Sequence, residues 1–264
     1  MEIFGYLAAI LIGISLGLIG GGGSILTVPV LVYLFGENAV QATGYSLFIV
    51  GITSLAGSIS YFKKGLVNVK TAVVFGIPSI IAVYATRAFI IPAIPEIVFK
   101  IGNFEIHKRL FLIGIFAVLM IIASYSMIRK RKKPQISKNE KQEFNYPLIL
   151  IEGIVVGMLT GLVGAGGGFL IIPALVMLSK LPMKEAVGTS LVIITVKSLL
   201  GFLGEKNMTK MDWNLIIFVS LFAIIGIVIG GILSNKINGE KLKPAFGWFV
   251  LAMGIYILIT EIIV

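Results

Sequence analysis

Two glycine tracts in apolar surroundings are the first residues of this sequence that could do chemistry. They lie in GLIGGGGSILTVPVLV from Gly17 and in GLVGAGGGFLIIPALV from Gly161. Glycine adopts backbone conformations that other residues avoid, so each tract can interrupt a helix. Helices that restart at Ser24 and Gly168 would direct unpaired N–H groups and positive dipole ends into the protein, which is an arrangement that binds anions. For one tract alone, tight helix packing through small residues is the simpler interpretation.

A lysine inside an apolar segment is the second candidate. Lys197 lies in TSLVIITVKSLLG, well away from either predicted end of that segment. Burying such a charge in a membrane costs at least about 2.5 kcal/mol, and the side chain usually faces a cavity or a partner. We predict that Lys197 contributes to an anion site. Snorkelling to the interface, or an ion pair with Glu152 or Glu205, is the alternative.

Hydroxyl side chains recur with the spacing of the tracts, which is 144 positions (161 − 17). Thr53 corresponds to Lys197 and Ser54 to Ser198, so the four side chains are predicted to line one pocket. The predicted substrate-binding residues are Gly20, Gly21, Gly22, Gly23, Ser24, Thr53, Ser54, Gly164, Gly166, Gly167, Gly168, Lys197 and Ser198.

Two other charged residues lie in apolar segments. Glu152, near the start of its segment, is the acidic candidate for proton coupling, with an interfacial position as the alternative. Arg87 lies late in its segment, and we expect its guanidinium to snorkel outward.

The match between the two tracts continues without a gap. Pro29 pairs with Pro173 and Gly44 with Gly188 at the same spacing, and Ser46 and Ser190 correspond in the same way. Chance similarity between apolar stretches would not keep Gly, Pro and Ser in register over about 45 residues. The chain is therefore predicted to consist of two similar halves.

Composition places most of the chain in lipid. Of 264 residues, 58% are hydrophobic and only 13% are charged, which is too few charges to cover an aqueous surface. The chain has no cysteine and a single histidine, His107, so thiol chemistry and a His-based metal site are not expected. No nucleotide-binding motif or catalytic constellation is present either, and neither an enzyme, a cofactor nor nucleic-acid binding is predicted.

Apolar segments divide the chain into equivalent sets of five, and the second of each set is too short for the roughly 20 residues that cross a bilayer. They are predicted at 4–19, 24–35, 39–61, 69–91 and 109–128, and at 147–163, 168–180, 184–204, 211–234 and 242–262. The predicted domains are an N-terminal transmembrane repeat (1–128), a basic linker (129–146) and a C-terminal transmembrane repeat (147–264).

Charge predicts the topology. The linker begins with Arg129-Lys130-Arg131-Lys132-Lys133, so the positive-inside rule places it in the cytoplasm and both termini outside. The third segment then runs inward and the eighth outward. The fold class predicted is an all-α polytopic membrane protein of two inverted five-segment repeats with helices that are short, re-entrant or broken at glycine, an architecture typical of secondary transporters.

Several motifs resemble one known family. GGGGSILTVPVL at Gly20 and GAGGGFLIIPAL at Gly164, followed by ATGYSL at Ala42 and AVGTSL at Ala186, are similar to the TauE/SafE family of sulfite exporters, as is YFKKGLVNVK at Tyr61. The resemblance implies an inner-membrane permease for small sulfur-containing anions such as sulfite, sulfoacetate or related organosulfonates, driven by an ion gradient.

The function predicted is an alternating-access exporter of such anions, coupled to protons or sodium. The alternative is a passive anion channel, since dipole-lined re-entrant segments also build selectivity filters. A membrane assembly partner without transport activity is a third interpretation. The expected partners are the anion, the coupling ion and the lipid bilayer, and a homo-oligomer is left open.

Overall fold

The computed structural model describes residues 2–21, 23–101, 104–128, 146–163, 168, 171–172, 175, 181–205 and 211–234, with residues 244, 247–248, 250–252 and 254–259 of the last segment. Its long helices are α1 (Glu2–Ile19), α2 (Ser24–Tyr33), α3 (Ala39–Lys63), α4 (Val69–Ala85), α6 (Lys108–Ile128), α7 (Tyr146–Val163), α9 (Met183–Leu203) and α10 (Trp213–Leu233). A π-helical turn, η1 (Thr86–Ile90), and the short α5 (Ile91–Ala93) continue α4, and strands β1 (Ile97–Ile101) and β2 (Phe104–His107) form a hairpin.

The described helices are those of a membrane protein. Four of them, α3, α4 through α5, α9 and α10, are long and apolar enough to cross a bilayer, and α1, α2 and α7 contain shorter apolar stretches. Large apolar side chains cover the outside of the bundle, including Ile81, Phe218 and Ile225, each more than half exposed. Such a surface is suited to lipid rather than to water. The all-α membrane fold predicted from composition is confirmed.

Most predicted segments agree with the helices to within two residues. The short second segment is present as α2, which packs against α1 and α3. The linker 129–145 and most of 168–180 and 242–262 lie outside the described residues. The connection that contains His107 forms the β1–β2 hairpin, which the sequence pattern did not predict.

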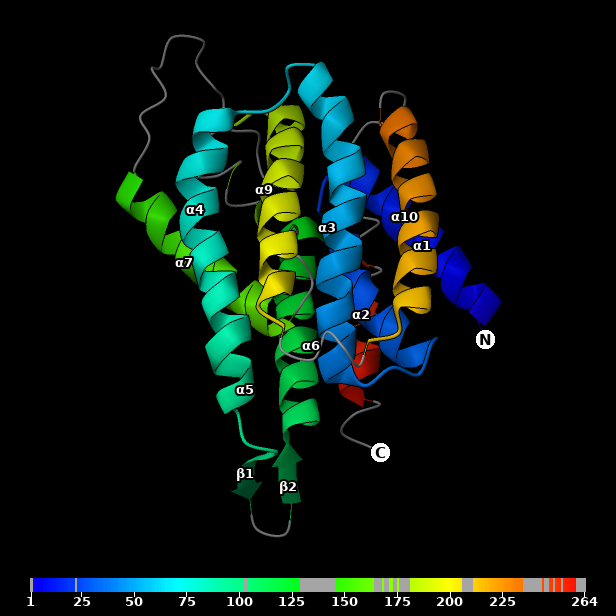
Figure 1. The fold of residues 1–264 in the computed structure, drawn as a ribbon, viewed down its shortest axis with the longest axis vertical. Coiled ribbons are helices and arrows are strands. Elements are labelled where there is room, and N and C mark those ends of the chain that lie inside the picture. Colours follow the sequence, from blue (N-terminus) through cyan, green and yellow to red (C-terminus); the bar gives the residue numbers. More distant parts are fainter. Residues whose placement is uncertain are drawn as a thin grey trace.

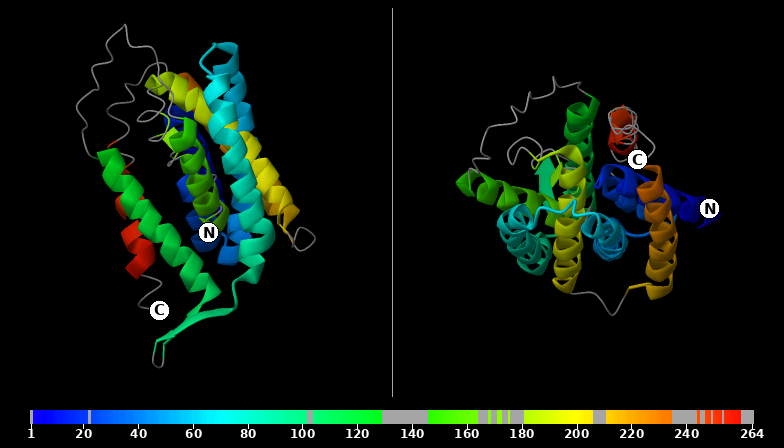
Figure 2. Two further views of the ribbon diagram at one scale, coloured as in Figure 1. Left: turned by 90° about the vertical axis from the view of Figure 1, so that its left-hand side faces the viewer. Right: turned by 90° about the horizontal axis from the view of Figure 1, so that it is seen from above.

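Six helices pack in a row whose order is α7, α4, α9, α3, α10, α1. Figure 2 shows the central part of this row from above, with α9 between α4 and α3. Helices related by the duplication are α1 and α7, α3 and α9, and α4 and α10. If each helix in the row is replaced by its counterpart, the order is the same but reversed.

The centre of the row is an antiparallel crossing of α3 and α9. Gly57 lies against Leu191, and Gly201 against Leu47, so the numbering rises along one helix as it falls along the other. Each of these contacts is the counterpart of the other at the spacing of 144. Figure 1 shows the opposite directions of the two helices. Thr53 and Lys197 lie near the middle of this crossing.

The outer pairs of the row meet along glycines. Gly13 of α1 packs on Ala223 of α10, and its counterpart Gly157 of α7 packs on Ser79 of α4. A side chain at either glycine would overlap the facing backbone. Small residues at a helix interface let backbones approach closely, which is how helices associate where water supplies no driving force. Each half thus contributes its first helix to the fourth helix of the other half.

Two hydrogen bonds between the halves also correspond to each other at the spacing of 144. The backbone N–H of Asn68 donates to Oγ1 of Thr189, and the backbone N–H of Asp212 donates to Oη of Tyr45, both at 2.9 Å. Asn68 and Asp212 also cap α4 and α10 with their side chains. Helix starts in opposite halves are therefore tied to the central helices in the same way.

Neighbouring glycines of α10 provide a test of the close contact between α1 and α10. A Cβ on Gly230 would lie 2.9 Å from the Cα of Ile14, whereas a Cβ on Gly231 would meet nothing within 4 Å. We expect Gly230→Ala to lower stability by about 1–3 kcal/mol through overpacking. Gly231→Ala should lose nothing, because alanine favours a helix over glycine by about 1 kcal/mol. Thermal unfolding in detergent measures both, and equal melting temperatures would contradict the packing described.

Candidate functional site

The first glycine tract breaks the chain between two helices. Helix α1 ends at Ile19, Gly20 has a φ of +78°, and α2 begins at Ser24. A positive φ is costly for residues with a Cβ, so glycine is needed at this position. Gly23 is the N-cap of α2, and no side chain caps that end of the helix. The first turn of α2 therefore begins inside the protein without a side-chain cap.

The two tracts meet in the interior. Gly21 packs directly on Gly168, and a Cβ on Gly21 would lie 2.6 Å from the Cα of Gly168. The carbonyl oxygen of Gly20 accepts a hydrogen bond of 2.9 Å from Oγ of Ser190 on α9. Predicted site residues Gly22, Gly164, Gly166 and Gly167 lie outside the described residues. The structure thus brings together Gly20, Gly21 and Gly168 against one face of α9.

Helix α2 contributes two buried hydroxyls. Ser24 donates to the carbonyl oxygen of Gly21 at 2.8 Å. Thr27, one turn later, is fully buried, and its Oγ1 has no hydrogen-bond partner among the described residues. Sequence reasoning overlooked Thr27. Its position three residues after Ser24, on the same face of a short helix, was the available signal.

Lys197 has no partner in the described part of the chain. Its side chain is fully buried within α9, and its Nζ makes no described hydrogen bond or ion pair. The hydroxyls of Ser198 and Ser54 are also buried without a partner, whereas Thr53 donates to the carbonyl oxygen of Ile49 at 2.6 Å. Three of the four polar side chains at the predicted pocket therefore have unused hydrogen-bonding capacity.

One face of α9 links Lys197 to the tracts. Ser190, Ile194 and Lys197 are spaced by four and three residues, so they share a helix face. Ser190 bonds to Gly20, and the side chain of Ile194 lies against Gly168. Lys197 follows them by one turn. The geometry combines a cationic group, hydroxyls and the start of a helix in one buried region, and all three interact favourably with an anion.

Arg87 does not snorkel outward as expected from the sequence. It is 1% exposed, and its Nη1 forms an ion pair of 3.2 Å with Oε2 of Glu205. The carboxylate of Glu205 offsets part of the free-energy cost of burying the charged guanidinium. Glu205 is therefore engaged by Arg87, and Lys197 does not pair with it. The signal in the sequence was the presence of opposite charges late in two segments predicted to end on the same side.

A cavity of about 170 Å³ lies at the position equivalent to this ion pair, at the other end of the bundle. Tyr61 and Gly231 are among its lining residues, and Lys64 lies at the same place. At the spacing of 144, Tyr61 corresponds to Glu205 and Gly231 to Arg87. One half therefore has the Arg87–Glu205 ion pair, and the other half has Tyr61, Gly231 and a cavity at the equivalent place.

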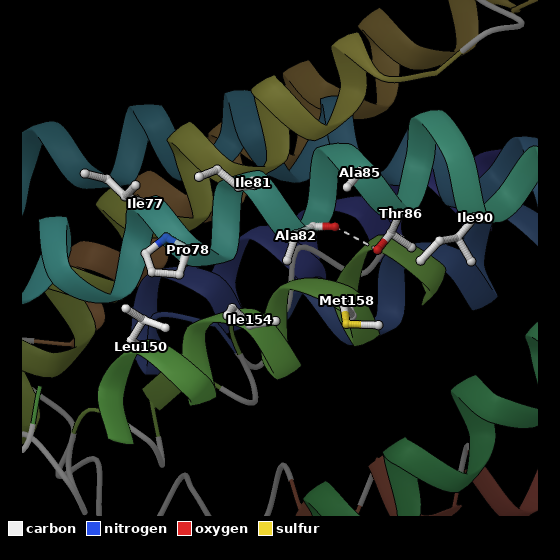
Figure 3. A pocket seen from close by; sticks show the side chains of 10 residues that line it. All are labelled: Ile77, Pro78, Ile81, Ala82, Ala85, Thr86, Ile90, Leu150, Ile154 and Met158. Atoms are coloured by element: carbon white, nitrogen blue, oxygen red, sulfur yellow. Dashed lines mark hydrogen bonds between the residues drawn. The ribbon is translucent and has the colours of Figure 1, made fainter. Parts of the chain in front are cut away.

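A larger groove of about 520 Å³ lies between α4 and α7 and is lined by Ile77, Pro78, Ile81, Ala82, Ala85, Thr86, Ile90, Leu150, Ile154 and Met158. Figure 3 shows these side chains, and the hydroxyl of Thr86 is directed to the carbonyl oxygen of Ala82, to which it donates at 2.7 Å. The lining has no charged group. This groove is therefore suited to apolar chains and not to an anion.

Glu152 is half-buried on α7. Its neighbour Gly153 packs on α4. No described contact joins Glu152 to the glycine tracts or to Lys197, so its coupling role stays a prediction. Among the residues that the structure describes, no three His, Cys, Asp or Glu side chains are grouped in a way that could hold a metal ion.

Comparison with known proteins identifies the family. A family model described as sulfite exporter TauE/SafE matches residues 5–257. The chain belongs to the TauE/SafE family. The resemblance of the doubled motifs is thus confirmed over nearly the whole chain, and the protein is a membrane transporter.

Relatives of this TauE/SafE protein occur in bacteria and archaea. A probable membrane transporter protein of Xylella fastidiosa is 29% identical over 252 residues, covering 94% of this chain and 91% of its own length. Probable membrane transporter protein MJ0441 of Methanocaldococcus jannaschii is 30% identical, with 89% and 85% covered. YunE of Bacillus subtilis, with the same description, is 30% identical, with 84% and 82% covered. No solved structure matches the chain significantly.

The buried ion pair can be tested against an exposed one. We expect Glu205→Gln to lower stability by about 3 kcal/mol, because it leaves the buried charge of Arg87 without a counter-charge. Lys100 and Glu105 in the hairpin form an exposed pair at 2.6 Å, and Glu105→Gln should cost at most about 1 kcal/mol. Thermal unfolding in detergent compares them.

Adding Arg87→Met to Glu205→Gln should restore part of the loss, since the uncompensated charge is then removed. Equal effects of Glu205→Gln and Glu105→Gln would argue against the pairing.

Proposed function

We propose that the protein is a secondary transporter, and an exporter, of small sulfur-containing anions such as sulfite or organosulfonates, working by alternating access and coupled to an ion gradient. The family description supplies the substrate class. The observation that carries the proposal is the fully buried, unpaired Nζ of Lys197, one helical turn after Ile194, whose side chain lies against Gly168 where the two glycine tracts meet. A buried lysine within a membrane segment is by default a functional group awaiting a partner.

The groups around Lys197 suit an oxyanion. The ammonium supplies charge, and the hydroxyls of Ser54, Ser198 and Thr27 supply donors that have no other described use. The start of α2 supplies a helix dipole, and anions are stabilised there. The substrate-binding residues predicted from the sequence remain our proposal for the site.

Contacts within the bundle support alternating access through inverted repeats. Duplicated glycine contacts and hydrogen bonds relate the two halves, whose central helices are antiparallel. Transporters with this relation move one bundle against another around a fixed site. The Arg87–Glu205 pair would hold the outer end closed, and the cavity at Tyr61 and Gly231 would leave the inner end without such a latch.

Charge favours export from the cytoplasm across the inner membrane. We place the basic linker, Lys63 and Lys64 inside, and both termini and the hairpin outside. Basic groups concentrate anions at the cytoplasmic entrance.

Flux in proteoliposomes tests the function. We expect saturable movement of sulfite, sulfoacetate or isethionate, and uphill movement of at least one of them under an imposed pH or sodium gradient. Lys197→Met should reduce that flux by at least about tenfold, because the anion loses its buried counter-charge. Lys100→Met is the control, since that lysine is 62% exposed in the hairpin. Downhill leakage alone would favour the channel, and no saturable movement of any of the three anions would refute the proposal.

Engineered cysteines test alternating access, since the chain has none of its own. Leu47 and Leu191 are equivalent, fully buried, and lie toward opposite ends of the α3–α9 crossing. In a Glu205→Gln background, a membrane-impermeant maleimide added outside should label Leu47→Cys faster, because the outer latch is weakened. Labelling of Leu191→Cys from inside should slow. Faster labelling at both positions would indicate loosening of the fold and would contradict alternation.

A further inference from the structure

We propose that Lys197 carries the coupling proton, so that one proton crosses the membrane with each anion. The inference rests on the proposed function and deepens it by naming the coupling ion and its binding group. Sequence reasoning left protons and sodium open and assigned a coupling role to Glu152. In the structure, Lys197 is the stronger candidate.

Burial without a counter-charge disfavours a charged lysine. Lys197 has no exposed surface, and its Nζ has no hydrogen-bond partner among the described residues. An ion removed from water without a counter-charge costs several kcal/mol, so a buried group of this kind gives up its charge instead. When an anion occupies the site, the cost is offset by the attraction between the two charges. Binding of the anion and binding of the proton therefore favour each other, and by linkage the effect is reciprocal.

No other charge in the described neighbourhood supplies the missing partner. The titratable and charged groups of α9 and of the elements packed on it are Tyr45, Tyr61 and Lys63 of α3, Lys70 and Tyr84 of α4, Arg87 of η1, and Lys184 and Glu185 of α9, with Glu205 just beyond. The carboxylates closest in sequence are about 12 Å (Glu205) and about 18 Å (Glu185) from Lys197 along the helix axis. Glu205 already pairs with Arg87.

The other buried cation of the bundle shows the contrast. Arg87 has a carboxylate at 3.2 Å, and a guanidinium stays charged in proteins. Lysine differs because its amine loses a proton readily when it is buried. The chain therefore places arginine where the charge has a permanent partner, and lysine where the partner would come and go.

The unpaired hydroxyls serve both states of the lysine. Ser54 and Ser198 are buried near the middle of the α3–α9 crossing with no described partner. A hydroxyl can accept a hydrogen bond from an ammonium or donate one to a neutral amine. The same side chains can also donate to a bound oxyanion. Neither hydroxyl makes a described hydrogen bond with Nζ of Lys197, so both are free to bond the ammonium or the anion once the anion binds.

The proton balance is simple. With the site open to one side, the neutral amine takes a proton from water on that side, an N–H bond forms, and the anion binds. After the conformational change, the anion leaves and the ammonium returns the proton to water on the other side. For an anion of single charge, no net charge crosses. Export then proceeds whenever the product of anion and proton concentrations is higher in the cytoplasm than outside.

Calorimetry of binding measures the proton directly. Isethionate is the probe, because it carries one charge and has no group that titrates near neutral pH. Titrating it into the purified native protein, in two buffers of different ionisation enthalpy, should show uptake of up to about one proton per anion bound. Lys197→Arg, whose guanidinium stays charged, should bind isethionate without taking up a proton. Binding to the native protein with no proton uptake, or uptake unchanged in Lys197→Arg, would overturn the inference.

Flux separates this inference from the function on which it rests. In proteoliposomes, an isethionate gradient should drive protons in the same direction, and a membrane potential should not alter the rate. In Lys197→Arg, an isethionate gradient should no longer drive protons, and thermal unfolding in detergent checks that this variant is folded. Net isethionate flux that is voltage-driven or sodium-driven, without protons, would leave a transporter but refute Lys197 as the carrier of the proton. No binding or flux of isethionate, sulfite or sulfoacetate would refute both.

Discussion

Helix backbones in this bundle touch at glycines, and the remaining structure depends on that close approach. In lipid, apolar side chains gain little by leaving their surroundings, so helices associate through packing and short-range contacts. Gly13 on Ala223 and Gly157 on Ser79 bring the backbones of the outer helix pairs together, and at the centre Gly57 and Gly201 leave room for the side chains of Leu191 and Leu47. Because these contacts occur in matched pairs, one packing rule shapes both halves. The row of helices follows from it.

Other glycines form the candidate site. Gly20 ends α1 with a backbone conformation that other residues avoid, and Gly21 meets Gly168 from the other half. The start of α2 is thereby directed into the interior and not to an interface. Irregular backbone at this depth is tolerated only where the protein satisfies it, and Ser190 does so for the carbonyl of Gly20. Glycine therefore serves both the packing of the helices and the proposed anion site.

Arg87 and Lys197 differ in whether their buried side chains have a counter-charge. Arg87 and Lys197 are both removed from solvent, but only Arg87 has a carboxylate partner in the described structure. A paired charge stabilises one arrangement of the helices, whereas an unpaired one makes the arrangement depend on a ligand. The end of the bundle next to the β1–β2 hairpin has the first kind of charge and the centre has the second. The cavity at Gly231, where the duplication leaves no arginine, makes the two ends unequal.

The sequence by itself determined the membrane class, the bounds of most helices and the break at the first glycine tract, because composition and glycine act locally, and it predicted a duplication. It also singled out Lys197, since a charge in an apolar run is visible without a structure. Only the tertiary structure decided that Glu205 belongs to Arg87, that Thr27 is buried without a partner, and that the tracts touch. These depend on which helices become neighbours, and the order of the row arises from contacts between residues far apart in the chain.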